Sequence, residues 1–258
     1  MAVVSQEICS KYTPNFAHQT TKNSALILKS KKNIILLVKI YKIPKDLRAI
    51  IFDIDGTLYT SPAYVFEQVD VQIRHWAKIN AWPVDFARKK METFRKEWSA
   101  SHGGKKISLG NAFTHFGVSI QESIKWRNEL LKPELFLKPN LELAKTLDLL
   151  KSKYKLIALT NNPILAAKKN LRAIGIEGEI QEIIGLDTCF KSKPNREMLD
   201  LACKLADCPA EQMLSVGDRF DIDLSLPLEM GMGGVLVCGA EDVILLAGKL
   251  GVDTESSY

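Results

Sequence analysis

The sequence predicts an α/β protein, a doubly wound parallel sheet with helices on both faces and an α-helical module inserted after its first core strand. Two observations predict this fold class. Short apolar segments alternate with helical ones from residue 134 onward, which is typical of parallel β–α units. Residues 61–133 interrupt the alternation, and their apolar residues recur at helical spacing. A third observation indicates function: four segments at predicted strand ends are polar, and ligands of such sheets bind there.

The length and the charge of the chain limit its possible partners. Its 258 residues allow one large domain or a domain with an insertion. No apolar run approaches the ~18 residues that a membrane-spanning helix needs, so we expect no membrane span. Residues 1–48 carry eight Lys, one Arg and two acidic residues, a net charge of +7, and the remainder carries −2. The main domain therefore offers no electrostatic basis for binding nucleic acid.

We expect residues 1–44 to be a basic tail or linker. Residues 1–32 are rich in Ser, Thr, Asn and Lys and show no clear periodicity. They lack the apolar core of a secretory signal, and their lack of Arg argues against a mitochondrial presequence. The apolar run at 34–38 fits either an extra strand or a linker, and a translation start downstream of Met1 is a further alternative.

The five cysteines are scattered and form no Cys-x-x-Cys pair, which argues against structural zinc. Reduced thiols and a cytoplasmic location are therefore expected. The sequence does not indicate an oligomeric state.

The helical module is expected to span residues 61–133. Ser61 and Pro62 form a typical helix start, with Ser as the N-cap and Pro in the first turn. This helix is predicted to end near Asn80, a second to follow Pro83, and two shorter ones to lie near 108–116 and 119–131. All four tryptophans lie in the module; we expect most to fill its core and one or two to face the site.

The core is expected to comprise residues 45–60 and 134–258. Beyond the first strand at 49–52, strands are predicted at 155–160, 179–186, 212–216 and 235–238. Helices are predicted between them, at 140–151, 164–174, 195–206 and 222–230.

The first polar strand end carries two carboxylates, Asp53 and Asp55, directly after a buried apolar run. Side chains alternate along a strand, so residues two apart would point the same way if the strand continued. Gly56 then permits a sharp turn. Because two buried acids are costly unless a cation or a reaction uses them, this pair favours a catalytic or metal site over a simple Asp-Gly surface turn.

Three further segments supply polar groups. Thr160 and Asn161 precede a helix, where hydroxyl and amide groups suit a phosphate oxygen, whereas Asn162 is interpreted as a helix cap. Lys193, followed by Pro194, is placed to neutralise a carboxylate and a phosphate, while Lys191 is interpreted as a solvated charge.

The fourth segment contains three acids, Asp218, Asp221 and Asp223. Acids also suit a helix N-terminus, which accounts for Asp221 but not for the whole cluster. We expect Asp218 to bind a metal directly and Asp223 to do so less directly, with Asp221 as the rival for that second position.

These four segments, in this order, resemble the motifs of the haloacid dehalogenase superfamily. The matches are Asp-x-Asp-Gly-Thr at residues 53–57, Thr160 after its strand, Lys-Pro at 193–194, and Gly-Asp-x-x-x-x-Asp at 217–223. The resemblance covers residues 46–240 and implies a Rossmann-like core with a helical cap inserted after the first motif. Within the superfamily, the sequence resembles the branches of the pyrimidine 5′-nucleotidases and of the phosphoglycolate phosphatases.

The resemblance implies a Mg²⁺-dependent phosphatase that hydrolyses a small-molecule phosphate ester through a phospho-aspartate. Asp53 would be the nucleophile and Asp55 the general acid and base, with Lys193 completing the catalytic group. Thr160, Asn161 and Lys193 would bind the phosphate. The Mg²⁺ ligands would be the side chains of Asp53, Asp218 and Asp223 and the backbone carbonyl of Asp55.

Two alternatives stay open at this point. One is a phosphomutase of the same fold, which also uses a paired aspartate. The other is a non-catalytic binding module, which the complete set of acids disfavours. A fold does not determine a substrate, so nucleotides, sugar phosphates and phosphoglycolate all stay open as substrates.

Overall fold

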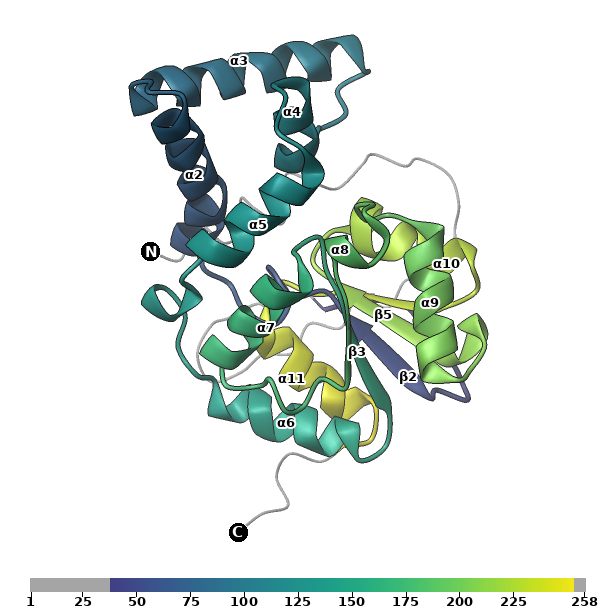
Figure 1. Cartoon of the computed structure of the whole chain (residues 1–258). Helices are drawn as coiled ribbons and strands as arrows, with labels where there is room; N and C mark the ends of the chain where they lie inside the picture. Colours follow the sequence, from purple (N-terminus) through teal and green to yellow (C-terminus); the bar gives the residue numbers. More distant parts are fainter. Residues whose placement is uncertain (1–37, 253–258) are drawn as a thin grey trace.

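A computed structural model describes residues 38–252 of the chain (Figure 1). The described residues form one six-stranded sheet in the order β1-β6-β5-β2-β3-β4. The edge strand β1 runs antiparallel to β6, and all other neighbouring strands are parallel. The strands are β1 (Lys39–Lys42), β2 (Ala49–Phe52), β3 (Lys155–Leu159), β4 (Glu182–Ile184), β5 (Met213–Gly217) and β6 (Gly233–Leu236).

Helices cover both faces of the sheet, which confirms the predicted doubly wound α/β fold (Figure 1). One face packs against α6 (Leu141–Lys151), α7 (Ile164–Ala173) and α11 (Ala240–Lys249). The other packs against α8 (Leu186–Cys189), α9 (Arg196–Ala206) and α10 (Ser225–Glu229). Short helical turns lie at Pro133–Leu135, Ala210–Gln212 and Phe220–Leu224.

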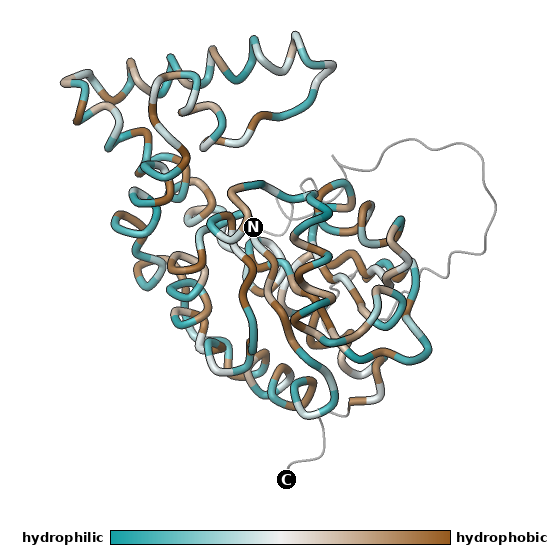
Figure 2. Tube along the Cα trace, turned by 45° about the vertical axis from the view of Figure 1, so that its right-hand side comes forward, coloured by the Kyte–Doolittle hydropathy of each residue, from teal (hydrophilic) through white to brown (hydrophobic). Residues whose placement is uncertain are grey.

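Strand β2 lies in the middle of this arrangement and is fully buried. Ile50 and Phe52 point into one apolar cluster, and Ala49 and Ile51 into the other. Figure 2 shows hydrophobic residues concentrated along the strands. A strand buried on both faces has no freedom to shift by a residue, because a shift would exchange the two sets of side chains. The residues that follow β2 are therefore held in a fixed position.

The helical module (residues 62–130) stands apart from the sheet and has its own apolar cluster (Figure 1). Ser61, Ser108 and Ser119 cap three of its helices by accepting hydrogen bonds from backbone N–H groups. Its centre is Trp76, whose ring lies 5.1 Å from Trp82 and 5.6 Å from Phe113. The helices are α2 (Pro62–Ile79), α3 (Val84–Ser101), α4 (Leu109–His115) and α5 (Ile120–Leu130).

Strand β1 differs from the sequence prediction, because the tail was expected to continue to residue 44. Residues 39–42 instead pair with β6, and Ile40 packs on the core. Alternating residues in a run of four give too weak a periodicity to separate an edge strand from a linker. The run at 34–38 lies outside the described residues except for its last residue.

Two smaller differences concern the C-terminal half. The helix expected over 222–230 begins with a wide π-helical turn at Phe220–Leu224 before α10, and β4 is shorter than the strand expected at 179–186. None of the described helices is long and apolar enough to cross a membrane.

Candidate active site

Three polar segments meet at the carboxyl edge of the sheet. In the strand register, Phe52 of β2 lies beside Ala158 of β3 and Val216 of β5. Asp53 continues this register, because its backbone N–H donates to the Val216 carbonyl at 2.9 Å. The residues that follow the three strands are therefore neighbours in space, as the sequence predicted.

Lys193 lies at the centre of the site, and its side chain is almost fully buried. Its ammonium donates to Asp53 Oδ1 at 2.5 Å, to Asp223 Oδ1 at 2.7 Å and to the Leu159 carbonyl at 2.8 Å. Burial opposes the charge on Lys193, but Asp223 and Asp53 raise its pKa above the ordinary value. Lys193 is therefore a charged ammonium with all three of its protons engaged.

Three carboxylates form a candidate metal centre. Asp53, Asp218 and Asp223 each place an oxygen within 4.8 Å of the other two. Asp218 Oδ1 is buried and accepts no hydrogen bond, and its ion-pair partner Arg219 Nε lies 3.6 Å away, so this oxygen keeps a lone pair for a cation. Oxygen-only donors of this kind fit Mg²⁺. Asp221 is exposed, so the structure brings Asp223, not Asp221, to the site.

Two glycines allow this close approach. At Gly56, which has a φ of 90°, an added Cβ would lie 2.4 Å from Asp218 Oδ2. At Gly217 it would lie 2.3 Å from the Asp223 Cβ. Neither position can accept a side chain without displacing one of the three acids.

The surroundings of the acids oppose their ionisation. Burial raises the pKa of Asp53 to about 7, because the neighbouring carboxylates add to the effect of desolvation while Lys193 only partly offsets it. Burial and Asp223 likewise raise the pKa of Asp218 to about 6. A divalent cation would relieve this repulsion, so the electrostatics agree with the geometry.

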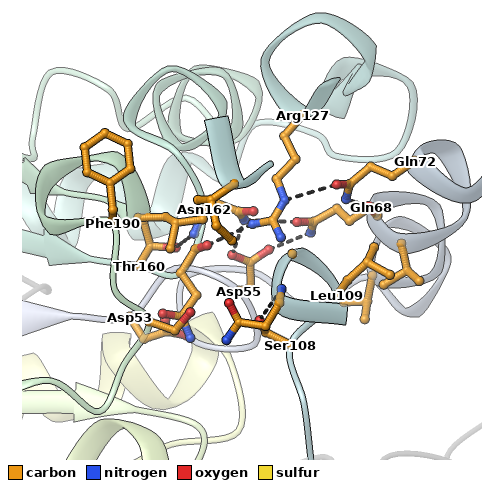
Figure 3. Close-up of a pocket in the computed structure, with 18 of the residues that line it drawn as sticks. Asp53, Asp55, Gln68, Gln72, Ser108, Leu109, Arg127, Thr160, Asn162 and Phe190 are labelled. Atoms are coloured by element: carbon orange, nitrogen blue, oxygen red, sulfur yellow. Dashed lines mark hydrogen bonds between the residues drawn. The ribbon is translucent and has the colours of Figure 1, made fainter. Parts of the chain in front are cut away.

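Asp55 has different neighbours, although it lies only two residues from Asp53. Its Oδ1 accepts hydrogen bonds from the Tyr59 hydroxyl and from Gln68 Nε2, the latter at 2.6 Å (Figure 3). Its Oδ2 accepts one from Asn162 Nδ2 at 2.9 Å. Burial raises the pKa of Tyr59 above its ordinary value, which keeps the hydroxyl protonated as a donor. The Asp55 side chain is therefore directed into the pocket and is not among the three clustered acids.

The segment after β3 lies between these two groups. The Thr160 hydroxyl is buried and accepts the Asn162 N–H at 3.1 Å, and Asn161 Oδ1 accepts the Lys193 N–H at 2.6 Å. The interpretation of Asn162 as a helix cap is wrong, because Pro163 takes the N-cap position of α7 without a side-chain hydrogen bond. Asn162 Nδ2 instead bonds Asp55 and Gln68, a role that sequence spacing does not reveal.

A pocket of about 280 Å³ lies between this edge and the helical module. The module contributes polar side chains that sequence reasoning missed, namely Gln68, Gln72 and Arg127. Gln68 and Gln72 are one helical turn apart, but polar residues at that spacing are ordinary on a surface helix, so the pattern carries no distinct signal. None of the four tryptophans lines this pocket.

A comparison with family models identifies the family. The family model of haloacid dehalogenase-like hydrolases matches residues 47–229, which include both the sheet edge and the helical module. The chain therefore belongs to the haloacid dehalogenase-like hydrolases and is an enzyme of the hydrolase class.

One solved structure agrees with this assignment at the level of the fold. The chain is similar to a HAD phosphatase from Thermococcus onnurineus, with 17% identity, a TM-score of 0.55, and coverage of 81% of this chain and 100% of that one. It is less similar to a predicted phosphoglycolate phosphatase from Haemophilus somnus 129PT (20% identity, TM-score 0.48, coverage of 79% and 92%). A 2-haloacid dehalogenase from Pseudomonas syringae pv. tomato DC3000 gives 16% identity, a TM-score of 0.46 and coverage of 73% and 85%. No curated protein matches the chain.

Proposed function

We propose that this hydrolase cleaves phosphate monoesters of small molecules through a phospho-aspartate on Asp53, with Mg²⁺ as its cofactor. The observation that carries the proposal is the contrast between the two carboxylates of the first motif. Both line the pocket, but Asp53 lies with Lys193 among the clustered acids, whereas Asp55 accepts a hydrogen bond from Gln68 of the helical module, on the side where a leaving group would lie. One carboxylate is thus placed for attack on phosphorus and the other for proton transfer.

In this mechanism Asp53 attacks phosphorus in line with the bond to the leaving oxygen. Lys193 orients the carboxylate through its 2.5 Å hydrogen bond and adds positive charge beside the transferring group. The Thr160 hydroxyl and the backbone of Asn161 border the pocket where the phosphoryl oxygens would lie.

Asp55 protonates the departing alkoxide and then removes a proton from the water that hydrolyses the phospho-aspartate. An alkoxide leaving group needs a proton, whereas a halide leaves without one. A proton donor at Asp55 therefore argues for phosphate esters over haloacids. Tyr59, Gln68 and Asn162 hold the carboxylate in one orientation for both steps.

The side chains of Asp53, Asp218 and Asp223, together with the Asp55 carbonyl, would hold the Mg²⁺. When bound, the cation supplies positive charge to the phosphoryl oxygens and to the carboxylates. The helical module is proposed to act as the cap that covers the pocket and excludes water from it.

The test is phosphate release from p-nitrophenyl phosphate and from a panel of alkyl phosphates, with Mg²⁺ or with EDTA. We expect Mg²⁺-dependent release, and Asp53→Asn should lower the rate by at least about 10²-fold, as expected for an essential group. Activity that survives EDTA, or an Asp53→Asn variant that keeps more than about a hundredth of the rate, would overturn the proposal. Isomerised sugar phosphate with little free phosphate would indicate a mutase, and halide release from haloacids a dehalogenase.

A further inference from the structure

The pocket is lined by more cationic than acidic side chains, and two of its arginines, Arg95 and Arg127, belong to the helical module. Three arginines line the pocket, and the acidic side chains that line it are Asp53 and Asp55. Arg219 lies 3.6 Å from Asp218, whereas Arg95 and Arg127 each donate to a backbone carbonyl. Of these two, Arg127 of α5 lies closer to the first motif, because its partner is Asn161 in the segment after β3.

Arg127 is partly buried, and among the described residues it has no carboxylate within ion-pair distance. Its Nη1 donates to the Asn161 carbonyl at 3.0 Å, and its Nε makes a long contact of 3.4 Å with Gln72 Oε1 (Figure 3). No described residue accepts a hydrogen bond from Nη2, which points toward Gly110, a pocket residue without a side chain. The guanidinium is thus fixed by two neutral oxygens and keeps donors directed at the pocket.

Arg127 differs from the arginines of this chain that bond to carboxylates. Arg74, Arg88 and Arg172 each bond to a carboxylate, although all three are more exposed. Burial lowers the pKa of Arg127 to about 10, although the Asp55 carboxylate partly offsets this effect, so the group remains charged at neutral pH. Because Asp55 is too far away to form an ion pair with it, an anionic ligand would stabilise this partly buried cation further.

The position of Arg127 indicates which part of a substrate would supply the anion. Figure 3 shows Asp55 between Asp53 and Arg127, and Asp55 interacts electrostatically with Arg127 and accepts a hydrogen bond from Gln68. The transferring phosphoryl group lies with Asp53 and Lys193 in the proposed mechanism. The guanidinium is therefore on the side of the leaving alcohol.

We propose that Arg127 binds a second anionic group, a carboxylate or a phosphate, carried by the leaving alcohol of the substrate. This inference rests on the proposed phosphatase function and specifies its substrate class. The pocket volume of about 280 Å³ lies just below the range of about 300–1,000 Å³ for ligand pockets. A short anionic alcohol fits this volume better than a nucleoside.

The experiment compares pairs of esters that differ in the second charge. The carboxylate pair is phosphoglycolate and 2-hydroxyethyl phosphate, and the phosphate pair is propane-1,3-diol bisphosphate and 3-hydroxypropyl phosphate. For each pair, the ratio of kcat/KM for the charged ester to that for the neutral ester is measured in wild type, Arg127→Gln, Arg127→Lys and Arg172→Gln. Both members of a pair are assayed on the same preparation, so partial misfolding of a variant cancels in the ratio.

We expect the wild type to favour the charged member of at least one pair by about 10- to 100-fold, the range for a hydrogen bond to a charged group. Arg127→Gln should bring that ratio close to one, and Arg127→Lys should keep part of it, because lysine retains the charge but not the planar fork. Arg172→Gln should keep the wild-type ratio, since Arg172 is exposed and paired with Glu177. The pair that responds identifies the anion as carboxylate or phosphate.

A wild type that hydrolyses p-nitrophenyl phosphate with Mg²⁺ but shows no preference for a charged ester would overturn this inference alone. A preference that survives Arg127→Gln would overturn it too, because the anion would then be bound elsewhere. An equal loss on both members of each pair would place Arg127 on the transferring phosphoryl group instead. Absence of any phosphate release would overturn the proposed function and this inference together.

Discussion

The carboxyl edge of the sheet and the pocket face of the helical module contribute differently to the same cavity. At the sheet edge, charged groups are buried and each is held by several hydrogen bonds, as Lys193 is by Asp53, Asp223 and Leu159. On the module, the pocket side chains include uncharged amides, and arginines that donate to neutral oxygens, such as Arg127 to the Asn161 carbonyl and to Gln72. The difference suggests that the edge carries the chemistry and the module the choice of substrate, and the predictions below test that division.

The largest effect is expected from Asp55→Asn, which removes the proposed proton donor. Alkyl phosphates should lose about 10²–10⁴-fold in kcat/KM, the usual contribution of a general acid. The loss on p-nitrophenyl phosphate should be smaller, because nitrophenolate leaves without much protonation. Steady-state kinetics on both substrates measure the difference. Equal losses would show that Asp55 acts by positioning or in the hydrolysis of the intermediate.

Lys193→Met tests how far the buried charges depend on one another. Activity should fall by about 10²–10³-fold, and without metal the variant should lose about 3–5 kcal/mol of unfolding free energy, because two carboxylates stay buried without a counter-charge. Urea denaturation in EDTA measures this loss, and Mg²⁺ should restore part of it. The matched control is Lys191→Met, whose side chain is half-exposed and pairs with Glu197, and it should change stability by less than about 0.5 kcal/mol. Similar losses in both variants would contradict the expected dependence.

Gln68→Leu tests the contact by which the module reaches the acid of the core. Gln68 donates to Asp55 at 2.6 Å and accepts from Asn162 at 3.0 Å. Losing it should lower kcat on alkyl phosphates by about 10-fold, the equivalent of one hydrogen bond to a charged group, and affect p-nitrophenyl phosphate less. Gln121→Leu, an exposed position on the same module, is the control. If KM changes and kcat does not, Gln68 contacts substrate instead of orienting Asp55.

The smallest effect is a pH dependence of stability that comes from the sheet edge. In the folded chain the pKa of Asp53 is raised from 3.8 to about 7 and that of Asp218 from 3.8 to about 6. The folded state thus holds these protons more tightly than the unfolded chain, so their stabilisation is complete below about pH 4 and is lost as the pH rises toward 7. In EDTA, we expect Tm to be lower at about pH 8 than at about pH 5 by roughly 5 °C or more.

Mg²⁺ competes with these protons, so the Tm increase that it causes should be larger at the higher pH. Differential scanning fluorimetry with Mg²⁺ or EDTA at both pH values measures this. An Mg²⁺ effect of equal size at both would mean that the three acids are not its ligands.

The sheet edge could be predicted from sequence because its residues are tied to strand ends. A buried parallel strand has a strong apolar pattern, and the strand register then places Asp53, Thr160 and Asp218 together. The sequence favoured Asp223 but left Asp221 as a rival, because the difference depends on the π-helical turn at Phe220–Leu224, and acids at either position suit the start of a helix.

The module could be predicted only as a set of helices. Its apolar spacing and serine caps predict helices α2 to α5. How these helices are placed against the sheet domain depends on contacts between residues far apart in the sequence, which a local pattern does not reveal. The partnership of Gln68 with Asn162 is an example, since the two residues are 94 positions apart. The edge strand β1 was missed for the same reason, because its partner β6 lies near the other end of the chain.

The hydrogen bond from the Lys193 backbone N–H to the Asn161 side chain has a consequence for how the site can vary. Together with the bond from Lys193 Nζ to the Leu159 carbonyl, it fixes the segment that contains Lys193 to the end of β3 and the loop that follows it. A change at Asn161 would tilt the lysine, and with it the carboxylate that it orients, although Asn161 touches neither the ammonium nor Asp53. Any redesign of this enzyme for a bulkier phosphoryl donor would therefore have to change the segments at 160–161 and 193–194 together.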